Sequence, residues 1–425
     1  MKISHLLKKT SIVFLFRLMG MGLSYVAILL ITNMYGAEVY GRFSLSQTVL
    51  QFLILLFSLG LGVSAVKLTS DSSFYKNGSP QNDYLKNSLY LILVSALVCV
   101  GLLFLLKDIL AIWVFKDIEL IPYFNYITGF FVFVVLQDFF AEFLRGRSKF
   151  FQYSLFKYLF PPLLFVLFLL VFKALEVNHD SVMLSYVLGL GLLSLVLIGF
   201  FPLRKMITTT KYSYHSLLSL SFPMMFSAAF LFLSNWTDVL MLGAMVSKTE
   251  VGIYNAAYKL AILALIVINA VNTVLAPKIS ALNSEQNYKA IGKEVQHATK
   301  LITLGTLPIV LVLVAFPSTL LSLFGPEFVE GKLVLIIVAV GLLFNALSGS
   351  VGQVLNMTKH QNELKKFTLI SVIVNVVLNI ILIKQMGIIG AAIASLVSNV
   401  TLNILCVVFI KKQMGFYAFF MPWKS

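Results

Sequence analysis

Charged side chains are scarce in this sequence of 425 residues, because Asp, Glu, Lys and Arg together make up only 12% of it. Apolar residues make up 59%, and the mean hydropathy is +0.95. A water-soluble protein does not carry so apolar a composition, since its surface needs polar side chains. Apolar runs of about 20 residues recur between short polar breaks, so we predict an all-α polytopic membrane protein.

Residues suited to metal or covalent chemistry are few and poorly spaced. Cys99 and Cys406 both lie in apolar runs, which favours packing over metal binding or a disulfide. No histidine has a second one at a metal-ligand spacing, and no phosphate-binding glycine loop or nucleophile elbow is present. We therefore predict no catalytic residue, no cofactor and no metal site, and a protein that is not an enzyme. The histidines all fall in loops or tails: His5, His179, His215, His297 and His360.

Twelve apolar segments are long enough to span a bilayer. The first follows lysines, as a signal peptide would, but Arg17 interrupts it and its apolar character continues to about Met34. We therefore expect a retained first helix. The expected helices cover residues 11–34, 43–66, 85–106, 120–144, 152–172, 182–203, 217–245, 251–276, 298–323, 333–356, 367–384 and 387–410.

These helices divide into two sets of six, expected as bundles of residues 1–205 and 206–425. Sliding the second half back by 211 positions places Gly41 on Gly252, a weak sign of an internal repeat. Two pseudo-symmetric bundles in the same orientation suit alternating access around a central site. No connection exceeds about 25 residues, which excludes a separately folded domain outside the membrane. The longest, 278–300, has the apolar spacing of a helix lying on the membrane surface.

Basic side chains outnumber acidic ones by 32 to 17, which gives a formal charge of +15. Their placement explains the excess without a nucleic-acid partner. Twenty-three lie in the terminal segments and alternate connections, seven lie in the intervening connections, and Arg17 and Lys259 lie inside helices. Because cytoplasmic connections are enriched in Lys and Arg, we expect both termini in the cytoplasm.

Asp238 and Lys259 lie inside expected helices on either side of the polar break Ser247–Glu250, each nine residues from its nearer end. A charge at this depth is costly and needs a partner or a wet cavity. One interpretation is a carboxylate whose protonation or ion occupancy changes during transport. The other is a permanent ion pair that joins two helices. Asn235 and Trp236 are within about one turn of Asp238, where they extend a polar, aromatic wall or simply pack.

Arg17 and Asp138 are the other charged residues placed well inside expected helices. In a functional interpretation, Arg17 binds an anionic substrate and Asp138 takes part in ion coupling. In the alternative, Arg17 reaches the cytosolic headgroups and Asp138 balances Arg145 and Arg147.

Amide side chains recur three or four positions apart, which places each pair on one helix face. We interpret these pairs as interhelical hydrogen bonds rather than as a substrate site. The pairs include Asn269 and Asn272, Gln353 and Asn356, Asn375 and Asn379, and Asn399 and Asn403.

Four stretches carry a resemblance to a known family: YGAEVYGRFSL at 35–45, DVLMLGAMVSKTEVGIYNAAYKL at 238–260, LFGPEF at 323–328 and GIIGAAIASLVSN at 387–399. In these the chain resembles polysaccharide export proteins, especially Wzx-type O-antigen and capsule repeat-unit flippases of the MOP (multidrug, oligosaccharidyl-lipid, polysaccharide) superfamily. The resemblance covers nearly the whole length. It implies two six-helix bundles around a cationic cavity in the bacterial inner membrane, and a sugar chain linked by pyrophosphate to undecaprenol as the substrate.

The resemblance also implies basic residues that bind the pyrophosphate. Arg17 and Lys259 match best, with Lys67 and Lys157 weaker because they fit cytoplasmic connections. Other implied partners are membrane lipids, H⁺ or Na⁺ as coupling ion, and the polysaccharide polymerase machinery.

Two other functions stay open. A cation-coupled multidrug exporter of the MATE (multidrug and toxin extrusion) type shares the architecture. A membrane polymerase or acyltransferase is opposed by the short connections, since such enzymes present larger external loops.

Overall fold

The computed structural model describes residues 3–70, 80–201 and 214–419, and within these ranges every regular element is a helix. The chain divides into two compact units after Phe232, inside helix α8. The expected boundary at 205/206 falls outside the described residues and stays a prediction.

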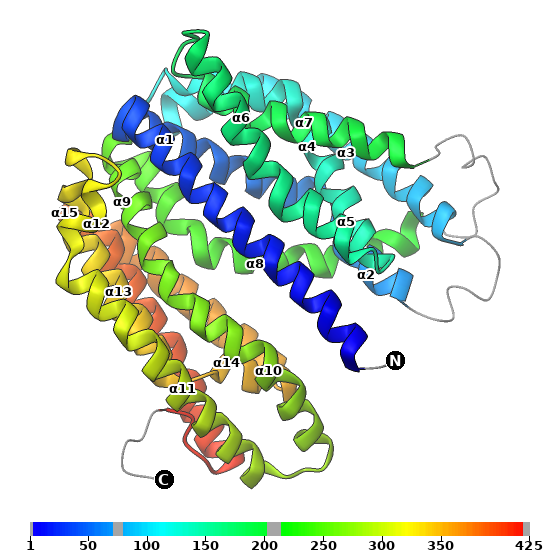
Figure 1. Cartoon of the computed structure of the whole chain (residues 1–425), viewed down its shortest axis with the longest axis vertical. Coiled ribbons are helices and arrows are strands. Elements are labelled where there is room, and N and C mark those ends of the chain that lie inside the picture. The colour runs from blue at the N-terminus through cyan, green and yellow to red at the C-terminus, as the bar shows by residue number, and fades with distance from the viewer. Residues whose placement is uncertain (1–2, 71–79, 202–213, 420–425) are drawn as a thin grey trace. The chain divides into compact units, whose positions relative to one another are not determined.

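The first unit contains seven α-helices, two π-helical segments and the beginning of α8 (Figure 1). Their bounds are α1 (Ile3–Phe57), α2 (Leu61–Ser70), α3 (Pro80–Asp108), η2 (Ile109–Val114), α4 (Leu120–Gly146), α5 (Phe150–Ser154), η3 (Leu155–Leu159), α6 (Phe160–Ala174), α7 (Ser181–Phe200) and α8 (Tyr214–Met245).

The second unit contains the end of α8 and the helices that follow it. Their bounds are α9 (Lys248–Ala261), η5 (Ile262–Ala264), α10 (Leu265–Ser284), α11 (Tyr288–Ala315), α12 (Pro317–Ser322), η6 (Pro326–Gly331), α13 (Lys332–Ser348), α14 (Val351–Met357) and α15 (Gln361–Met414).

The described residues contain ten helical stretches long and apolar enough to cross a membrane. Two of them, in α1 and α15, are each interrupted by a glycine with a positive φ, Gly36 (φ 83°) and Gly387 (φ 57°). An L-residue with a side chain rarely adopts such a conformation, so glycine permits the chain to reverse there. Each interrupted stretch therefore supplies two crossings, and the predicted twelve-helix architecture is confirmed. The side on which the termini lie stays a prediction.

The internal repeat is clearer in the backbone than in the side chains. The offset of 211 positions that aligns Gly41 with Gly252 also places the break at Gly36 on Ser247, which lies between α8 and α9. Both halves thus interrupt their first two crossings at the same place.

The prediction for 278–300 was wrong. Instead of a separate surface helix, α10 continues to Ser284 and α11 begins at Tyr288, so the two form a helical hairpin. Ile291 and Val295 are fully buried in a cluster with α14 and the end of α15, because their spacing of four matches the face that α11 turns inward.

Helix α4 forms the core of the first unit and contacts α1, α2, α3 and α7. Five of its seven phenylalanines are almost fully buried, and the polar Gln137 and Glu142 are buried with them. Since α4 is surrounded by other helices, its charged side chains need partners inside the unit.

Candidate functional site

Ser247 and Glu250 form a capping box that begins α9. The Ser247 hydroxyl accepts a hydrogen bond from the Glu250 backbone N–H (3.2 Å), and the Glu250 carboxylate accepts one from the Ser247 N–H (3.1 Å). The polar break therefore belongs to the first turn of α9 rather than to a loop. As a result α8 and α9 reverse around Val246 and Ser247, which decides which residues face each other.

Asp238 is the most fully enclosed of the predicted site residues, with 5% of its surface exposed. Its Oδ1 accepts hydrogen bonds from the amides of Asn375 (3.0 Å) and Asn379 (2.7 Å). Its Oδ2 accepts from the hydroxyls of Tyr254 (2.8 Å) and Ser395. All four donors are uncharged, so the carboxylate is held by dipoles from α9 and α15 rather than by a cation.

Oxygen atoms are concentrated around Asp238. Asn375 Oδ1 accepts a hydrogen bond from Asn379, whereas the buried Asn379 Oδ1 has no hydrogen-bond partner among the described residues. Rotating the Asn379 amide by half a turn would place Oδ1, instead of Nδ2, beside the Asp238 carboxylate. The Tyr254 and Ser395 hydroxyls are also acceptors. Such oxygens suit a hard cation, and a single carboxylate balances one positive charge.

This set differs from a transition-metal or divalent-ion site. Within the described ranges no group of three or more His, Cys, Asp or Glu side chains is placed to hold a metal ion. In charge and in ligand type, the single carboxylate and the oxygen atoms around it match a monovalent cation.

Lys259 does not pair with Asp238, so the predicted alternative of an ion pair between them was wrong. The Lys259 ammonium lies over the Trp236 ring, 5.3 Å from its centroid. The physical reason is the register of the hairpin: reversal at Val246 and Ser247 brings Tyr254 opposite Asp238, and leaves Lys259 nearer the preceding turn of α8. Asn235 is exposed on that turn.

Arg17 lies on the exposed side of α1, with its guanidinium 5.8 Å from the centroid of the Tyr158 ring. Gly20, one turn further, permits this approach, because a Cβ there would lie 2.0 Å from the Tyr158 carbonyl oxygen. Arg17 thus belongs to the first unit, and Lys259, Trp236 and Asp238 to the second.

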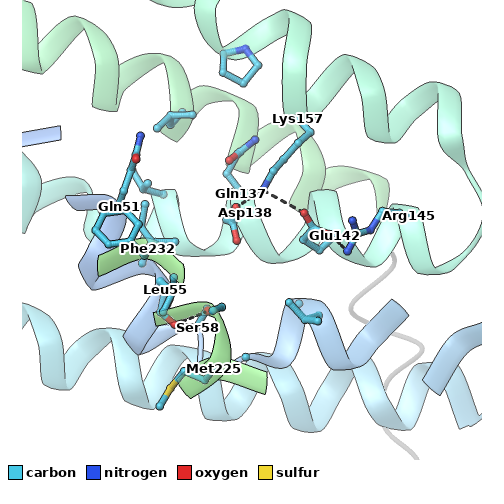
Figure 2. A pocket seen from close by; sticks show the side chains of 18 of the residues that line it. Gln51, Leu55, Ser58, Gln137, Asp138, Glu142, Arg145, Lys157, Met225 and Phe232 are labelled. Carbon is cyan, nitrogen blue, oxygen red and sulfur yellow. Dashed lines mark hydrogen bonds and ion pairs between the residues drawn. The ribbon is translucent and has the colours of Figure 1, made fainter. Parts of the chain in front are cut away.

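Asp138 lies in the first unit and is paired with Lys157, at 2.5 Å from Nζ to Oδ1. Lys157 also reaches Glu142 Oε1 (3.2 Å), and Glu142 pairs with Arg145 (2.8 Å) (Figure 2). The alternative prediction, that Asp138 balances Arg145 and Arg147, was wrong, because the cation that pairs with Asp138 is Lys157. Lys157 lies on the π-helical segment η3, and Asp138 and Glu142 lie one turn apart on α4, so one ammonium reaches both carboxylates.

Several site residues were missed or undervalued in the sequence. Asn375 and Asn379 were correctly interpreted as an interhelical hydrogen-bonding pair, but their partner, Asp238, was not identified. Tyr254 and Ser395 carried no signal beyond their place in apolar helices. Glu142 did carry a sequence signal, because it follows Asp138 by four positions and so lies on the same helix face. The side chain of Lys67, a weaker candidate, lies outside the described residues.

Comparison with known proteins gives two family matches. Residues 6–283 match the polysaccharide biosynthesis protein family (Polysacc_synt), and residues 223–381 match the MatE family.

Three curated relatives share part of the chain. The probable low-salt glycan biosynthesis flippase Agl15 of Haloferax volcanii is 27% identical over 165 residues, which are 39% of this chain and 35% of that protein. The probable flippase AglR of the same organism is 28% identical over 176 residues (41% and 37%). The capsular polysaccharide biosynthesis protein CapF of Staphylococcus aureus is 25% identical over 181 residues (42% and 46%). The matched region thus spans less than half of each relative.

Solved structures match over nearly the whole chain. The lipid II flippase MurJ, in an inward closed conformation, has a TM-score of 0.78 at 18% identity, covering 95% of this chain and 87% of that one. A multidrug resistance MATE transporter of the MOP superfamily has a TM-score of 0.80 at 14% identity, covering 93% and 94%. At these identities the likeness establishes the fold alone.

Proposed function

Since the chain belongs to the polysaccharide biosynthesis protein family, we propose that it is a flippase for lipid-linked glycan precursors. In this proposal it moves undecaprenyl-pyrophosphate-linked repeat units of O-antigen or capsule from the cytoplasmic to the outer leaflet of the bacterial inner membrane. The observation that carries the proposal is the family match across most of a twelve-crossing helical chain. The relatives named as flippases support it. The polymerase machinery would then receive the translocated units.

Substrate binding is proposed for Arg17, Lys259, Asn235 and Trp236. The Arg17 guanidinium lies beside the Tyr158 ring, and the Lys259 ammonium lies beside the Trp236 ring. A cation held by a ring face can still accept an anion on its other side, and arginine suits phosphate through its two parallel N–H groups. The pyrophosphate is the strongly anionic part of the proposed substrate.

Coupling to an ion gradient is proposed for Asp238, with H⁺ or Na⁺ as the ion. Its support is the buried carboxylate whose neighbours in α9 and α15 all carry oxygen atoms. Occupancy by an ion would change the hydrogen bonds that join these helices, which gives the ion differential affinity for two arrangements. Asp138 is the weaker coupling candidate, because Lys157 already balances its charge.

A cation-coupled multidrug exporter is the second candidate. The MatE family match at 223–381 favours it, and that match includes the buried carboxylate of Asp238. A drug cation would need an accessible anionic group, whereas Asp238 accepts four hydrogen bonds and Asp138 is paired with lysine.

Deleting the encoding gene in its own bacterium and complementing it on a plasmid tests the function. For a flippase we expect loss of surface glycan and accumulation of lipid-linked repeat units in the cytoplasmic leaflet, both restored by the plasmid. An exporter predicts unchanged glycan and greater sensitivity to cationic drugs. Normal glycan with no accumulated precursor would contradict the proposal.

A further inference from the structure

A cavity of about 480 Å³ lies within the first unit and is separate from Asp238. It falls within the range of about 300–1,000 Å³ that small-molecule sites occupy. Figure 2 shows the charged residues of α4 with Lys157 along one side, and Gln51, Leu55 and Phe232 along another. Helix α8 contributes Met225 and Ala228.

The charged groups that line this cavity balance one another. Lys157 is shared by Asp138 and Glu142, and Arg145 pairs with Glu142, so two cations face two anions. Glu142 has only 11% of its side chain exposed, and Asp138 and Lys157 have less than a third. A charged ligand would have to break these contacts and leave a poorly hydrated charge unpaired, which is costly. The cavity therefore favours a neutral ligand over a pyrophosphate or a drug cation.

Hydrogen-bonding groups nevertheless remain along the polar side. Gln137 donates through Nε2 to the Phe156 carbonyl (2.7 Å), which fixes its amide and leaves Oε1 as an acceptor. Lys157 donates to Asp138 Oδ1, so Asp138 Oδ2 remains as a hydrogen-bond acceptor toward the cavity. The Ser58 hydroxyl donates to the Leu55 carbonyl (3.2 Å) and keeps its own acceptor sites. These groups can accept hydrogen bonds from hydroxyl donors.

The other lining is apolar and includes aromatic rings. Phe232 stacks on Phe52, with ring centroids 5.7 Å apart, and Tyr186 is held edge-on by Phe43 and Phe165. A sugar ring has the matching character, because its hydroxyls lie around its edge and its C–H groups form an apolar face. Rings fixed by their neighbours lose little conformational freedom when such a ligand binds.

We infer that this cavity binds an uncharged sugar residue of the translocated glycan. The inference rests on the proposed flippase function, and it assigns the sugar and the pyrophosphate to different groups of the protein. The neutral lining selects a repeat unit without an acidic sugar at this position.

Cysteine protection in the full-length protein tests the inference. Cys99 and Cys406 are first replaced by Ala, and a single cysteine is introduced by Ala228→Cys in the cavity lining. Phe226→Cys is the matched control, two positions away on α8, outside the lining and 56% exposed. The protein in lipid nanodiscs is treated with a maleimide in the presence of three probes: undecaprenyl pyrophosphate, the same lipid bearing N-acetylglucosamine, and the same lipid bearing glucuronic acid.

We expect the N-acetylglucosamine lipid to slow labelling of Ala228→Cys at least about 5-fold, in line with ligand coupling energies of 1 kcal/mol or more. The other two probes and the control position should show little protection. Equal protection by the lipid without sugar, or by the glucuronic acid lipid, would overturn the inference.

Native mass spectrometry of the same samples separates the two levels of the proposal. If the N-acetylglucosamine lipid binds the protein but leaves Ala228→Cys unprotected, the sugar site is wrong while the flippase proposal stands. If none of the three lipids binds, the proposed function itself is contradicted. The variant Ser58→Cys, on a different side of the cavity, repeats the test if Ala228→Cys does not fold.

Discussion

The amide of Asn379 in α15 donates a hydrogen bond of 2.7 Å to the carboxylate of Asp238 in α8, across 141 positions of the sequence. Tyr254 in α9 donates to the other carboxylate oxygen. One acidic side chain therefore links three helices of the second unit, and a change in its charge or occupancy would alter all of these contacts together.

Asp238→Asn should remove the dependence of transport on an ion gradient. The variant keeps the size of the side chain but loses the charge that attracts a proton or cation. In wild-type proteoliposomes we expect an imposed H⁺ or Na⁺ gradient to change the transport rate by about 5-fold or more, as for coupling energies above 1 kcal/mol. The variant should show the same rate with and without the gradient.

Ser371→Ala is the matched control for this measurement. Ser371 also lies in α15 and donates to the Ser398 carbonyl (2.8 Å), but it makes no hydrogen bond to Asp238. Its response to the gradient should match that of the wild type. If Asp238→Asn responds normally as well, Asp238 has a structural role only.

Arg17→Ala should weaken binding of the lipid-linked substrate. Loss of charge-assisted hydrogen bonds of about 1.5–3 kcal/mol corresponds to about 10–150-fold in affinity. Arg17→Lys should retain part of it, because it keeps the charge without the paired N–H groups. Binding of undecaprenyl pyrophosphate to the purified variants measures this, with Lys366→Ala as a control at an exposed lysine. Equal affinities for all variants would exclude Arg17 from the site.

Lys259→Met should also reduce surface glycan, at unchanged protein level, if Lys259 binds the anionic substrate. Methionine keeps the length of the side chain and its contact with Trp236, so the change removes mainly the charge. Lys259→Arg should restore most of the glycan, since it keeps a cation over the ring. Full glycan in Lys259→Met would assign Lys259 to packing against Trp236.

Lys157→Met should lower the stability of the first unit, because it removes the cation that Asp138 shares with Glu142 and leaves Arg145, paired with Glu142, as the remaining cation of the cluster. Breaking a buried pair costs about 3–5 kcal/mol, and partial exposure reduces this to about 1–3 kcal/mol here. Thermal unfolding in detergent should show a lower Tm, and adding Glu142→Gln should recover part of the loss. An unchanged Tm would mean that water or ions already screen the cluster.

Gly36→Ala should destabilise the protein by about 1–3 kcal/mol, because φ 83° and ψ −179° lie in a region that essentially only glycine adopts. Gly101→Ala is the matched control, since Gly101 lies inside α3 and a Cβ added there would meet open space. It should leave the Tm unchanged or slightly raised, as expected for alanine in a helix. Equal Tm values for both variants would show that the reversal of the chain at Gly36 does not need glycine.

The sequence predicted the membrane-spanning segments well because hydrophobic length is a local property. The expected helix at 120–144 corresponds to α4, despite Pro122, since proline is tolerated in the first turn. The resemblance to polysaccharide export proteins was likewise visible in local stretches and is confirmed by the family match.

The partners of the charged side chains were predicted less well. Asp238 and Lys259 lie at equal distances from the polar break Ser247–Glu250, but a capping box in that break begins α9, so the chain reverses before it and Tyr254 lies opposite Asp238.

By itself, the sequence determined that this chain crosses the membrane about twelve times and carries a few costly charges inside it, because both follow from the transfer of side chains into lipid. Only the tertiary structure decided which groups satisfy those charges. Asp238 is held by Asn375, Asn379, Tyr254 and Ser395, and Asp138 is held by Lys157. Such partners come from helices distant in sequence, and their contact depends on helix register and rotation, which local composition does not encode.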